Sequence, residues 1–162
     1  MMNPPYRILF VCLGNICRSP LAEGVFNKKI KEKGLYAYCE VDSCGTSGYH
    51  IGDLPDPRTR ENALKHEVKL FHKARQLTQA DLDSFDYILA MDEDNMKAIK
   101  SLDKHNAFKE KIFLIRSFEQ DSDQKDVPDP YFGGEEGFEN VFNILDRSID
   151  GLIKYLQQKH SF

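Results

Sequence analysis

Short apolar runs alternate with amphipathic segments along most of this chain. Four apolar runs have the length and composition of buried β-strands: Arg7 to Cys12, Cys39 to Cys44, Tyr87 to Met91 and Ile112 to Ile115. Because these runs are continuously apolar rather than alternating, both faces of the sheet that they form should be covered. The pattern therefore predicts an α/β fold, a single doubly wound domain with a four-stranded parallel sheet and helices on both faces.

The helices are indicated by their ends as well as by their spacing. Ser19 and Pro20 predict the N-cap and first residue of a helix that Gly34 ends. Three further helices are expected, over Arg58 to Glu67, Asp94 to Leu102 and Phe138 to Leu156. Two segments rich in glycine, proline or polar residues are expected to be loops, Gly45 to Pro57 and Glu119 to Pro130.

Composition narrows the class of protein. The chain has 162 residues, of which 41% are hydrophobic, and its 22 Lys and Arg against 26 Asp and Glu give a net charge of -4. One domain, spanning residues 1–162, is the expected organisation. No basic stripe indicates nucleic-acid binding. No apolar run approaches the roughly 18 residues of a membrane span, and Ile8 to Leu13 is too short for a signal peptide, so we expect a cytoplasmic protein without a membrane partner.

The cysteines allow two interpretations. Cys12, Cys17, Cys39 and Cys44 form two C-x4-C pairs, which could hold a structural zinc ion. Structural zinc sites usually have tighter spacing, and Cys12 lies within a stronger pattern, so we expect reduced thiols and no metal site.

That stronger pattern is the segment Cys12 to Ser19, CLGNICRS, which follows the first strand. The amides of a tight loop, together with a helix N-terminus, form a cradle for a dianion such as phosphate. Arg18 can grip two phosphate oxygens and, with the amides, stabilise a thiolate at Cys12 in line with phosphorus. The remaining residues of the expected phosphate-binding loop are Leu13, Gly14, Asn15, Ile16, Cys17 and Ser19.

Ser19 has two possible roles in this loop. It can cap the following helix, or it can also hydrogen-bond the sulfur of Cys12.

Expulsion of an alkoxide or phenoxide from phosphate requires a proton donor opposite the nucleophile. Asp129 is the best candidate, because Pro128 and Pro130 on either side restrict its backbone. Asp126 and Asp123 are competitors in a looser polar setting.

Aromatic residues lie close to this acid in the sequence or in the glycine-rich loop. Tyr131 and Phe132 follow Asp129, and Tyr49 lies in the segment Gly45 to Pro57. They could line a slot for a flat aromatic leaving group, or they could simply pack their loops.

Five motifs resemble those of the low-molecular-weight protein tyrosine phosphatases, in the same order and spacing from about residue 6 to residue 156. They are VCLGNICRSPLAEG at 11–24, GTSG at 45–48, HKARQ at 72–76, YILAMD at 87–92 and DVPDPY at 126–131. The resemblance implies that Cys12 is the nucleophile, Arg18 the phosphate clamp, and Asp129 the general acid and then the general base. It implies hydrolysis of protein phosphotyrosine through a phosphocysteine intermediate without a metal or another cofactor.

The resemblance also implies a hydrogen-bond network behind the loop, made by Asn15, Ser19, Ser43, His72 and Asp92. Asn15 has an independent rationale, because asparagine tolerates the left-handed conformation that such a loop requires. His72 taken alone is more often an ordinary histidine, and Asp92 could merely cap the helix that follows it.

Substrate contacts and ligands follow from the same resemblance. Tyr49 and His50 occupy the family's variable substrate-contact loop, and Phe132 stands where many members have a second tyrosine. The expected partners are phosphotyrosine proteins or peptides, with inorganic phosphate, sulfate or vanadate as active-site ligands.

Three other functions deserve comparison. Thioredoxin-coupled arsenate reductases need further cysteines, and residues 45–162 contain none. A phosphocysteine-carrying sugar-transport subunit would lack the arginine that closes the loop, here Arg18. A non-catalytic phosphopeptide-binding module would have lost the nucleophile or the acid, and both Cys12 and Asp129 are present.

Cys17 lies close to Cys12 in the loop, which leads to a redox hypothesis. Oxidants could drive a reversible disulfide between the two and so protect the nucleophile, or Cys17 could be an ordinary packed thiol.

Overall fold

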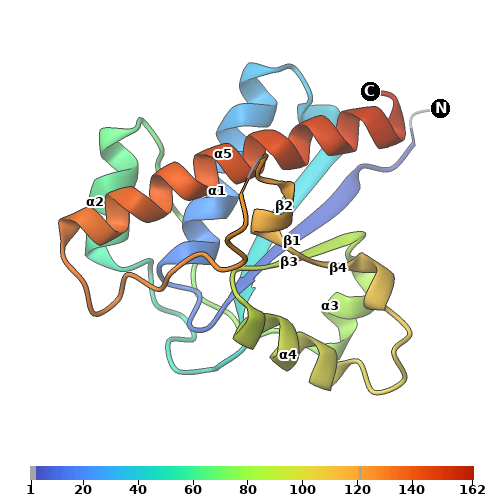
Figure 1. The fold of residues 1–162 in the computed structure, drawn as a ribbon, viewed down its shortest axis with the longest axis horizontal. Coiled ribbons are helices and arrows are strands. Elements are labelled where there is room, and N and C mark those ends of the chain that lie inside the picture. The colour runs from blue at the N-terminus through green and yellow to red at the C-terminus, as the bar shows by residue number, and fades with distance from the viewer. Residues whose placement is uncertain (1–2, 121) are drawn as a thin grey trace.

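A computed structural model describes residues 3–120 and 122–162 (Figure 1). The strands are β1 (Tyr6–Cys12), β2 (Cys39–Gly45), β3 (Tyr87–Ala90) and β4 (Ile112–Leu114). The α-helices are α1 (Arg18–Glu32), α2 (Pro57–Lys65), α3 (Gln79–Ser84), α4 (Glu93–Leu102) and α5 (Glu135–His160). Short 3₁₀ helices span Tyr36–Tyr38, Lys109–Lys111 and Ile115–Phe118.

The four strands form one parallel sheet in the order β2-β1-β3-β4. The chain passes from β1 to β2 on one side and then returns to place β3 on the other side of β1. The strand order therefore reverses beside β1, and ligands of such sheets bind at the carboxyl ends of the strands at this point. The predicted sheet and its first loop are confirmed.

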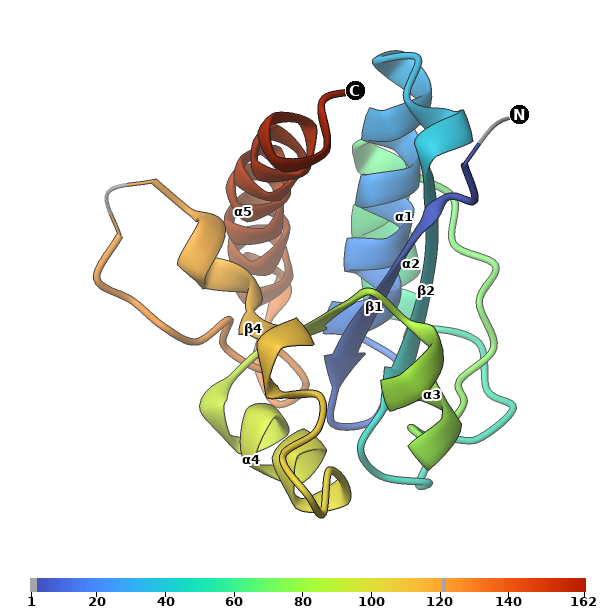
Figure 2. The same cartoon turned by 90° about the vertical axis from the view of Figure 1, so that its right-hand side faces the viewer.

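Helices cover both faces of the sheet (Figures 1 and 2). Helices α1 and α5 pack on one face, where Ile8, Phe10 and Cys12 of β1 join the larger core. Helices α3 and α4 lie against the other face, where Leu9 and Val11 join a second core. Successive residues of β1 thus enter opposite cores, which explains why the strand is apolar without interruption. No helix among the described residues is long and apolar enough to cross a membrane.

The boundaries differ from the predictions in a few places. Helix α1 begins at Arg18 with Cys17 as its N-cap, so the prediction that Ser19 caps it is wrong. Gly34 ends the helix region as expected, with φ of 71°. Met91 and Ile115 fall just outside β3 and β4. The described part of the predicted loop Glu119 to Pro130, which leaves out residue 121, contains no helix or strand.

Helix α3 was not predicted, although a local signal for it exists. Thr78 and Asp81 form a capping box, in which each side chain bonds the other's backbone at the start of the helix. The helix has few apolar residues, so hydrophobic spacing alone could not reveal it.

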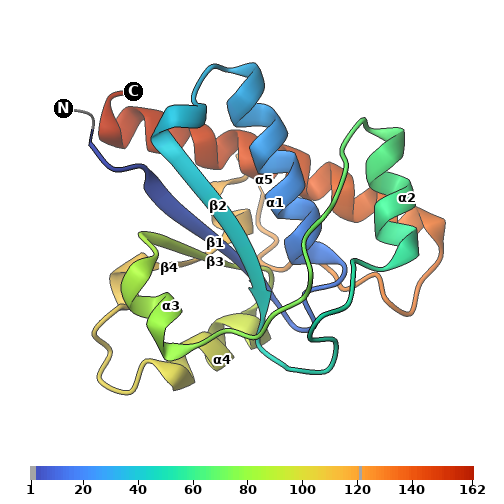
Figure 3. The same ribbon diagram turned by 180° about the vertical axis from the view of Figure 1, so that it is seen from behind.

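The segment 66–78, which joins α2 to α3, passes beside β2 (Figure 3). It is held there because Gly45 donates to the carbonyl of Arg75 at 2.9 Å and Leu77 donates to the carbonyl of Gly45 at 2.8 Å. This path brings His72 and Arg75 behind the loop that follows β1.

Candidate active site

The loop after β1 is held from outside by the segment that follows β2. Thr46 donates to the carbonyl of Cys12, Ser47 to that of Leu13 and Asp56 to that of Ile16, at 2.9, 2.9 and 2.8 Å. Since the carbonyl and amide of a peptide unit point in opposite directions, this arrangement leaves the loop amides free to point inward. In the neighbouring peptide unit, the amide of Asn15 donates to Cys12 Sγ at 3.3 Å.

Close approach of two backbones requires glycine at position 45. A Cβ atom there would lie 2.7 Å from the carbonyl oxygen of Leu13. The first glycine of the GTSG motif therefore allows the loop to rest on the end of β2.

Cys12 ends β1 with only 2% of its surface exposed. Its sulfur lies 3.0 Å from Ser19 Oγ and accepts the hydrogen bond from Asn15. Ser19 lies inside α1 and does not cap it. Of the two roles considered for Ser19, the structure therefore shows the contact with the Cys12 sulfur.

Arg18 is buried at the start of α1, and its guanidinium is fixed at one end. Nη1 donates to Asp92 Oδ2 at 2.7 Å and to the carbonyl of Val127 at 2.9 Å, while Nη2 lies 3.6 Å from Asp129 Oδ2. Burial alone would lower the pKa of Arg18, but Cys12 and Asp92 outweigh it and raise the pKa. The Val127 contact was not predicted, because a backbone acceptor leaves no mark in the sequence.

Asp129 is held at the cavity by its own loop. Val127 is buried and donates to the carbonyl of Met91 at 2.7 Å, which fixes the loop to the end of β3. Asp129 Oδ1 accepts from the amide of Tyr131 at 3.1 Å. The competitors lie elsewhere: Asp126 accepts from the amide of Glu93 at 2.9 Å, and Asp123 is exposed.

A cavity of about 300 Å³ opens over this group. Its lining includes Cys12, Arg18, Asp129 and all four predicted slot residues, Tyr49, His50, Tyr131 and Phe132. The exposed fractions of Tyr49 and Phe132 are 80% and 96%, so both have unused aromatic surface beside the cavity. Such an opening can hold a flat ring whose phosphate reaches the loop.

The side chain of Asn15 joins the loop to its surroundings, and its φ of 58° is left-handed as predicted. Nδ2 donates to Ser19 Oγ at 2.7 Å and to Ser43 Oγ at 3.0 Å. Oδ1 accepts from the amide of Arg75 at 3.0 Å and lies 2.8 Å from His72 Nε2. Because Oδ1 is an acceptor, Nε2 of His72 must be the nitrogen that carries a proton.

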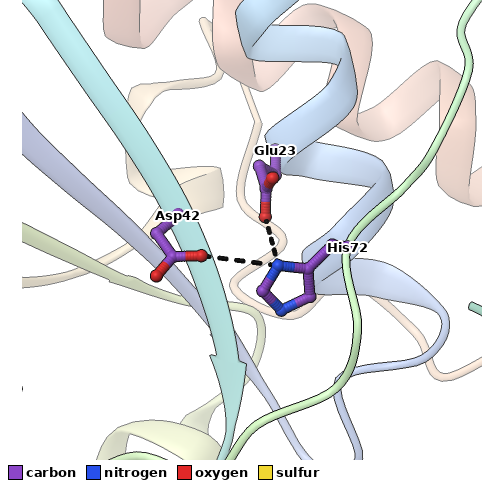
Figure 4. A group of neighbouring side chains, drawn as sticks. All are labelled: Glu23, Asp42 and His72. Carbon is purple, nitrogen blue, oxygen red and sulfur yellow. Dashed lines mark ion pairs between the residues drawn. The ribbon is translucent and has the colours of Figure 1, made fainter. Parts of the chain in front are cut away.

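Acidic residues that the sequence analysis did not single out surround the other side of His72. Glu23 Oε1 and Asp42 Oδ1 lie 3.2 and 3.4 Å from Nδ1 (Figure 4). Burial raises the pKa of Glu23 to about 7, against a hydrogen bond from Ser43 Oγ. Arg75 forms an ion pair with Asp42 at 3.0 Å. These contacts depend on the path of segment 66–78, for which the sequence indicated only that His72 lies behind the loop.

The cysteines do not form the zinc site considered from their spacing. Cys39 begins β2 and Cys44 lies near its other end, and all four thiols are free. Among the described residues, the one cluster with metal-ligand geometry contains no cysteine. Burial raises the pKa of Cys17 to about 12 and that of Cys39 to about 11, so both remain thiols at neutral pH.

This geometry can be compared with known proteins. Residues 7–161 match the family described as low molecular weight phosphotyrosine protein phosphatase. The protein of that name from Schizosaccharomyces pombe is 42% identical over 142 residues, covering 87% of this chain and 90% of the relative. The human protein of that name is 43% identical over 136 residues, covering 83% and 85%. A crystal structure of a protein tyrosine phosphatase from Entamoeba histolytica, with Hepes in its active site, has a TM-score of 0.91 at 39% identity and covers 96% and 99%.

Proposed function

The chain belongs to the low-molecular-weight phosphotyrosine protein phosphatase family, and on this premise we propose that it hydrolyses protein phosphotyrosine and aryl phosphates through a phosphocysteine intermediate. The observation that carries the proposal is the convergence of Cys12, Arg18 and Asp129 on one cavity. An enzyme of this family needs those three groups within reach of a single phosphate, and the cavity brings them together.

In the first step, the thiolate of Cys12 attacks phosphorus and forms a phosphorus–sulfur bond. The bond from phosphorus to the phenolic oxygen breaks, and Asp129 gives its proton to that oxygen. The proposal is supported by the position of Asp129 at the cavity and by its restrained loop. Ser19 Oγ and the Asn15 amide, which contact Sγ, stabilise the sulfur anion.

In the second step, a water molecule gives a proton to Asp129 and attacks phosphorus. The phosphorus–sulfur bond breaks, the electron pair returns to Cys12 as a thiolate, and inorganic phosphate leaves. The thiolate is a good leaving group because the same donors contact it before and after the reaction.

Charge on the phosphate is neutralised by the protein itself in this proposal. Arg18 is fixed by Asp92 and Val127, so its remaining N–H groups are oriented before substrate binds. With the inward amides, it provides the positive field that a metal provides in kinases, and no metal or other cofactor takes part. Phosphate, sulfate and vanadate should bind in the same cradle.

The aromatic slot supports a preference for phosphotyrosine. Tyr49, Tyr131 and Phe132 line the cavity above Cys12, and their rings can contact a phenol but gain little from a short aliphatic chain. We infer that phosphoserine, whose phosphate lies closer to the peptide backbone, reaches Cys12 poorly.

Redox control is a further part of the proposal. Peroxide would oxidise Cys12 to a sulfenic acid; the Cys17 thiolate would then attack that sulfur to form a disulfide, and the hydroxide released would take up a proton from solvent. Because the pKa of Cys17 is about 12, its thiolate fraction is small and closure should be slow at neutral pH. Reversible control of this kind suits a reducing cytoplasm, the location that we propose.

Two assays test the reaction. Hydrolysis of p-nitrophenyl phosphate should proceed in EDTA and be inhibited by vanadate, and a tyrosine-phosphorylated peptide should be hydrolysed much faster than its phosphoserine counterpart. Cys12→Ser should lower kcat by roughly 10⁴-fold or more, yet retain phosphate binding. Cys39→Ser, which changes a thiol at the far end of the sheet, is the matched control. Full activity of Cys12→Ser would contradict the mechanism.

A further inference from the structure

A second group of side chains with metal-ligand chemistry lies behind the phosphate loop. Glu23 comes from α1, Asp42 from β2 and His72 from the segment 66–78 (Figure 4). Their ligand atoms all lie within 4.8 Å of one another. We propose that these three residues bind one divalent transition ion such as Zn²⁺, at a site separate from the phosphate cavity.

The spacing of the ligand atoms fits a metal ion better than direct hydrogen bonds. His72 Nδ1 lies 3.2 Å from Glu23 Oε1 and 3.4 Å from Asp42 Oδ1. Tetrahedral zinc, with bonds of about 2.0–2.1 Å to nitrogen and oxygen, separates its ligands by about 3.3 Å. Direct N–H···O bonds are most often about 2.9–3.0 Å long. The two distances from Nδ1 therefore match those of a zinc site, and all three ligand atoms lie within 4.8 Å of one another.

The hydrogen bonds around His72 prepare it to be a ligand. Asn15 Oδ1 requires the proton of His72 to be on Nε2, so a neutral imidazole directs the lone pair of Nδ1 toward Glu23 and Asp42. Metal-bound histidines usually donate their other N–H to an oxygen acceptor, which fixes the ring and its tautomer. Asn15 is that acceptor here.

The two carboxylates are also held by outer partners. Ser43 Oγ donates to Glu23 Oε1 at 2.7 Å. Arg75 donates to Oδ2 of Asp42, and the amide of Ser43 donates to Oδ1 at 2.8 Å, which holds Oδ1 at 3.4 Å from His72 Nδ1. Two carboxylates and one imidazole favour a borderline ion over Mg²⁺ or Ca²⁺, which prefer oxygen ligands alone.

A route from solvent reaches these residues. Glu23 and His72 line a cavity of about 350 Å³ between α1 and residues 67–72. An ion and a water ligand for its fourth position can enter there. Bound at Nδ1, the ion leaves the bond from Nε2 to Asn15 intact and connects α1, β2 and segment 66–78. It therefore takes no part in phosphoryl transfer.

Calorimetric titration with ZnCl₂ tests the site. We use the full chain with Cys12→Ser, because the active-site thiolate is itself a zinc ligand. This protein should bind one equivalent of Zn²⁺. Adding Glu23→Gln should weaken binding at least about tenfold, whereas Glu67→Gln should not change it. Glu67 lines the same cavity and loses the same charge, so it is the matched control. Equal affinities for the two carboxylate variants, or no binding at millimolar Zn²⁺, would overturn the proposal.

Cobalt spectroscopy gives an independent measurement. Co²⁺ bound to the wild-type chain at this site should show d–d bands that Glu23→Gln abolishes. Bands that survive Glu23→Gln, or that come only with thiolate-to-cobalt charge transfer, would assign the ion to the cysteines and contradict the proposal. If Glu23→Gln does not fold by circular dichroism, Asp42→Asn replaces it, because Arg75 can still donate to the asparagine oxygen.

Discussion

The buried Arg18 and the partly exposed Asp92 form an ion pair, with Nη1 2.7 Å from Oδ2, that joins the start of α1 to the end of β3. Asp92 also uses its other oxygen, which accepts from the amide of Asn95 at 2.7 Å and caps α4. Of the two interpretations considered for Asp92 from the sequence, the helix cap is present, and Oδ2 of Asp92 contacts Arg18 rather than the side chains bonded to Asn15. The amide of Asn95 holds the carboxylate of Asp92, and this carboxylate in turn positions the guanidinium of Arg18.

Asp92→Asn separates these two roles. Asparagine still caps α4, but the charge that orients Arg18 is lost. Charge-assisted hydrogen bonds contribute roughly 1.5–3 kcal/mol, so we expect kcat/KM for p-nitrophenyl phosphate to fall about 10- to 100-fold, with weaker inhibition by phosphate. Asp94 is an exposed neighbour in α4. Asp94→Asn should change neither kcat/KM nor the inhibition by phosphate. Normal phosphate inhibition in Asp92→Asn would refute this positioning role.

Asp129→Asn removes the proposed acid. Turnover of phosphotyrosine should fall by about 10² to 10⁴, because the phenolic oxygen then leaves without a proton. The loss should shrink with leaving groups of lower pKa, such as dinitrophenol, which need no proton. Asp126→Asn is the control, since Asp126 bonds Glu93 instead of facing the cavity. An equal loss of turnover for all leaving groups would show that Asp129 is not the proton donor to the leaving group.

Asn15 combines a left-handed backbone with a four-way side-chain network, and two variants distinguish these features. Asn15→Gly keeps the backbone conformation and loses the network, whereas Asn15→Ala loses the network and adds a backbone cost of about 1 kcal/mol. Both should lower kcat, and the alanine variant should also have the lower Tm. Asn106, with φ of 51° in an exposed loop, provides the comparison for backbone cost alone. An unchanged kcat in Asn15→Gly would show that the side-chain hydrogen bonds of Asn15 do not contribute to catalysis.

Cys17 should resolve oxidised Cys12 slowly and faster at higher pH. Well below its pKa of about 12, the Cys17 thiolate fraction rises about tenfold for each pH unit. After peroxide treatment, the activity that dithiothreitol recovers should therefore increase between pH 7 and pH 9. Cys17→Ala should lose that recovery, and Cys39→Ala should keep it. Recovery that is independent of both pH and Cys17 would exclude the disulfide.

Glu119 should make the protein sensitive to acid. Burial would raise its pKa, but hydrogen bonds from Arg116 and Arg147, at 2.8 and 2.9 Å, outweigh burial and lower it below 4.5. A lowered pKa in the folded state stabilises the fold above pH 4.5, and this contribution disappears as the pH falls through the folded-state pKa.

Urea unfolding at several pH values measures this effect. Glu119→Gln should lower the free energy of unfolding at pH 7 by roughly 1.5–3 kcal/mol and flatten its decline below pH 5. Glu93→Gln, which breaks the exposed pair with Lys125, should do neither. Parallel pH curves for wild type and Glu119→Gln would contradict the assignment.

The sequence predicted the parts of the fold that hydrophobic burial determines. The four strands are recognisable because both of their faces enter a core, and α5 is recognisable because one stripe of it does. The phosphate loop was recognisable because its residue types must follow one another along the chain.

The parts that could not be predicted depend on contacts between distant segments. Segment 66–78 has no regular structure and is placed by its bonds to Gly45. The approach of Glu23 and Asp42 to His72 follows from that placement. Acidic residues on a helix and an edge strand would otherwise be expected to face solvent.

The bonds from residues 46, 47 and 56 to the loop after β1 have a consequence for how the enzyme fails. A transient opening of this surface segment would release the loop carbonyls while both cores stayed packed. Catalytic activity should therefore be lost before the fold is. Mild heat or denaturant should inactivate the enzyme at conditions under which its helices remain folded.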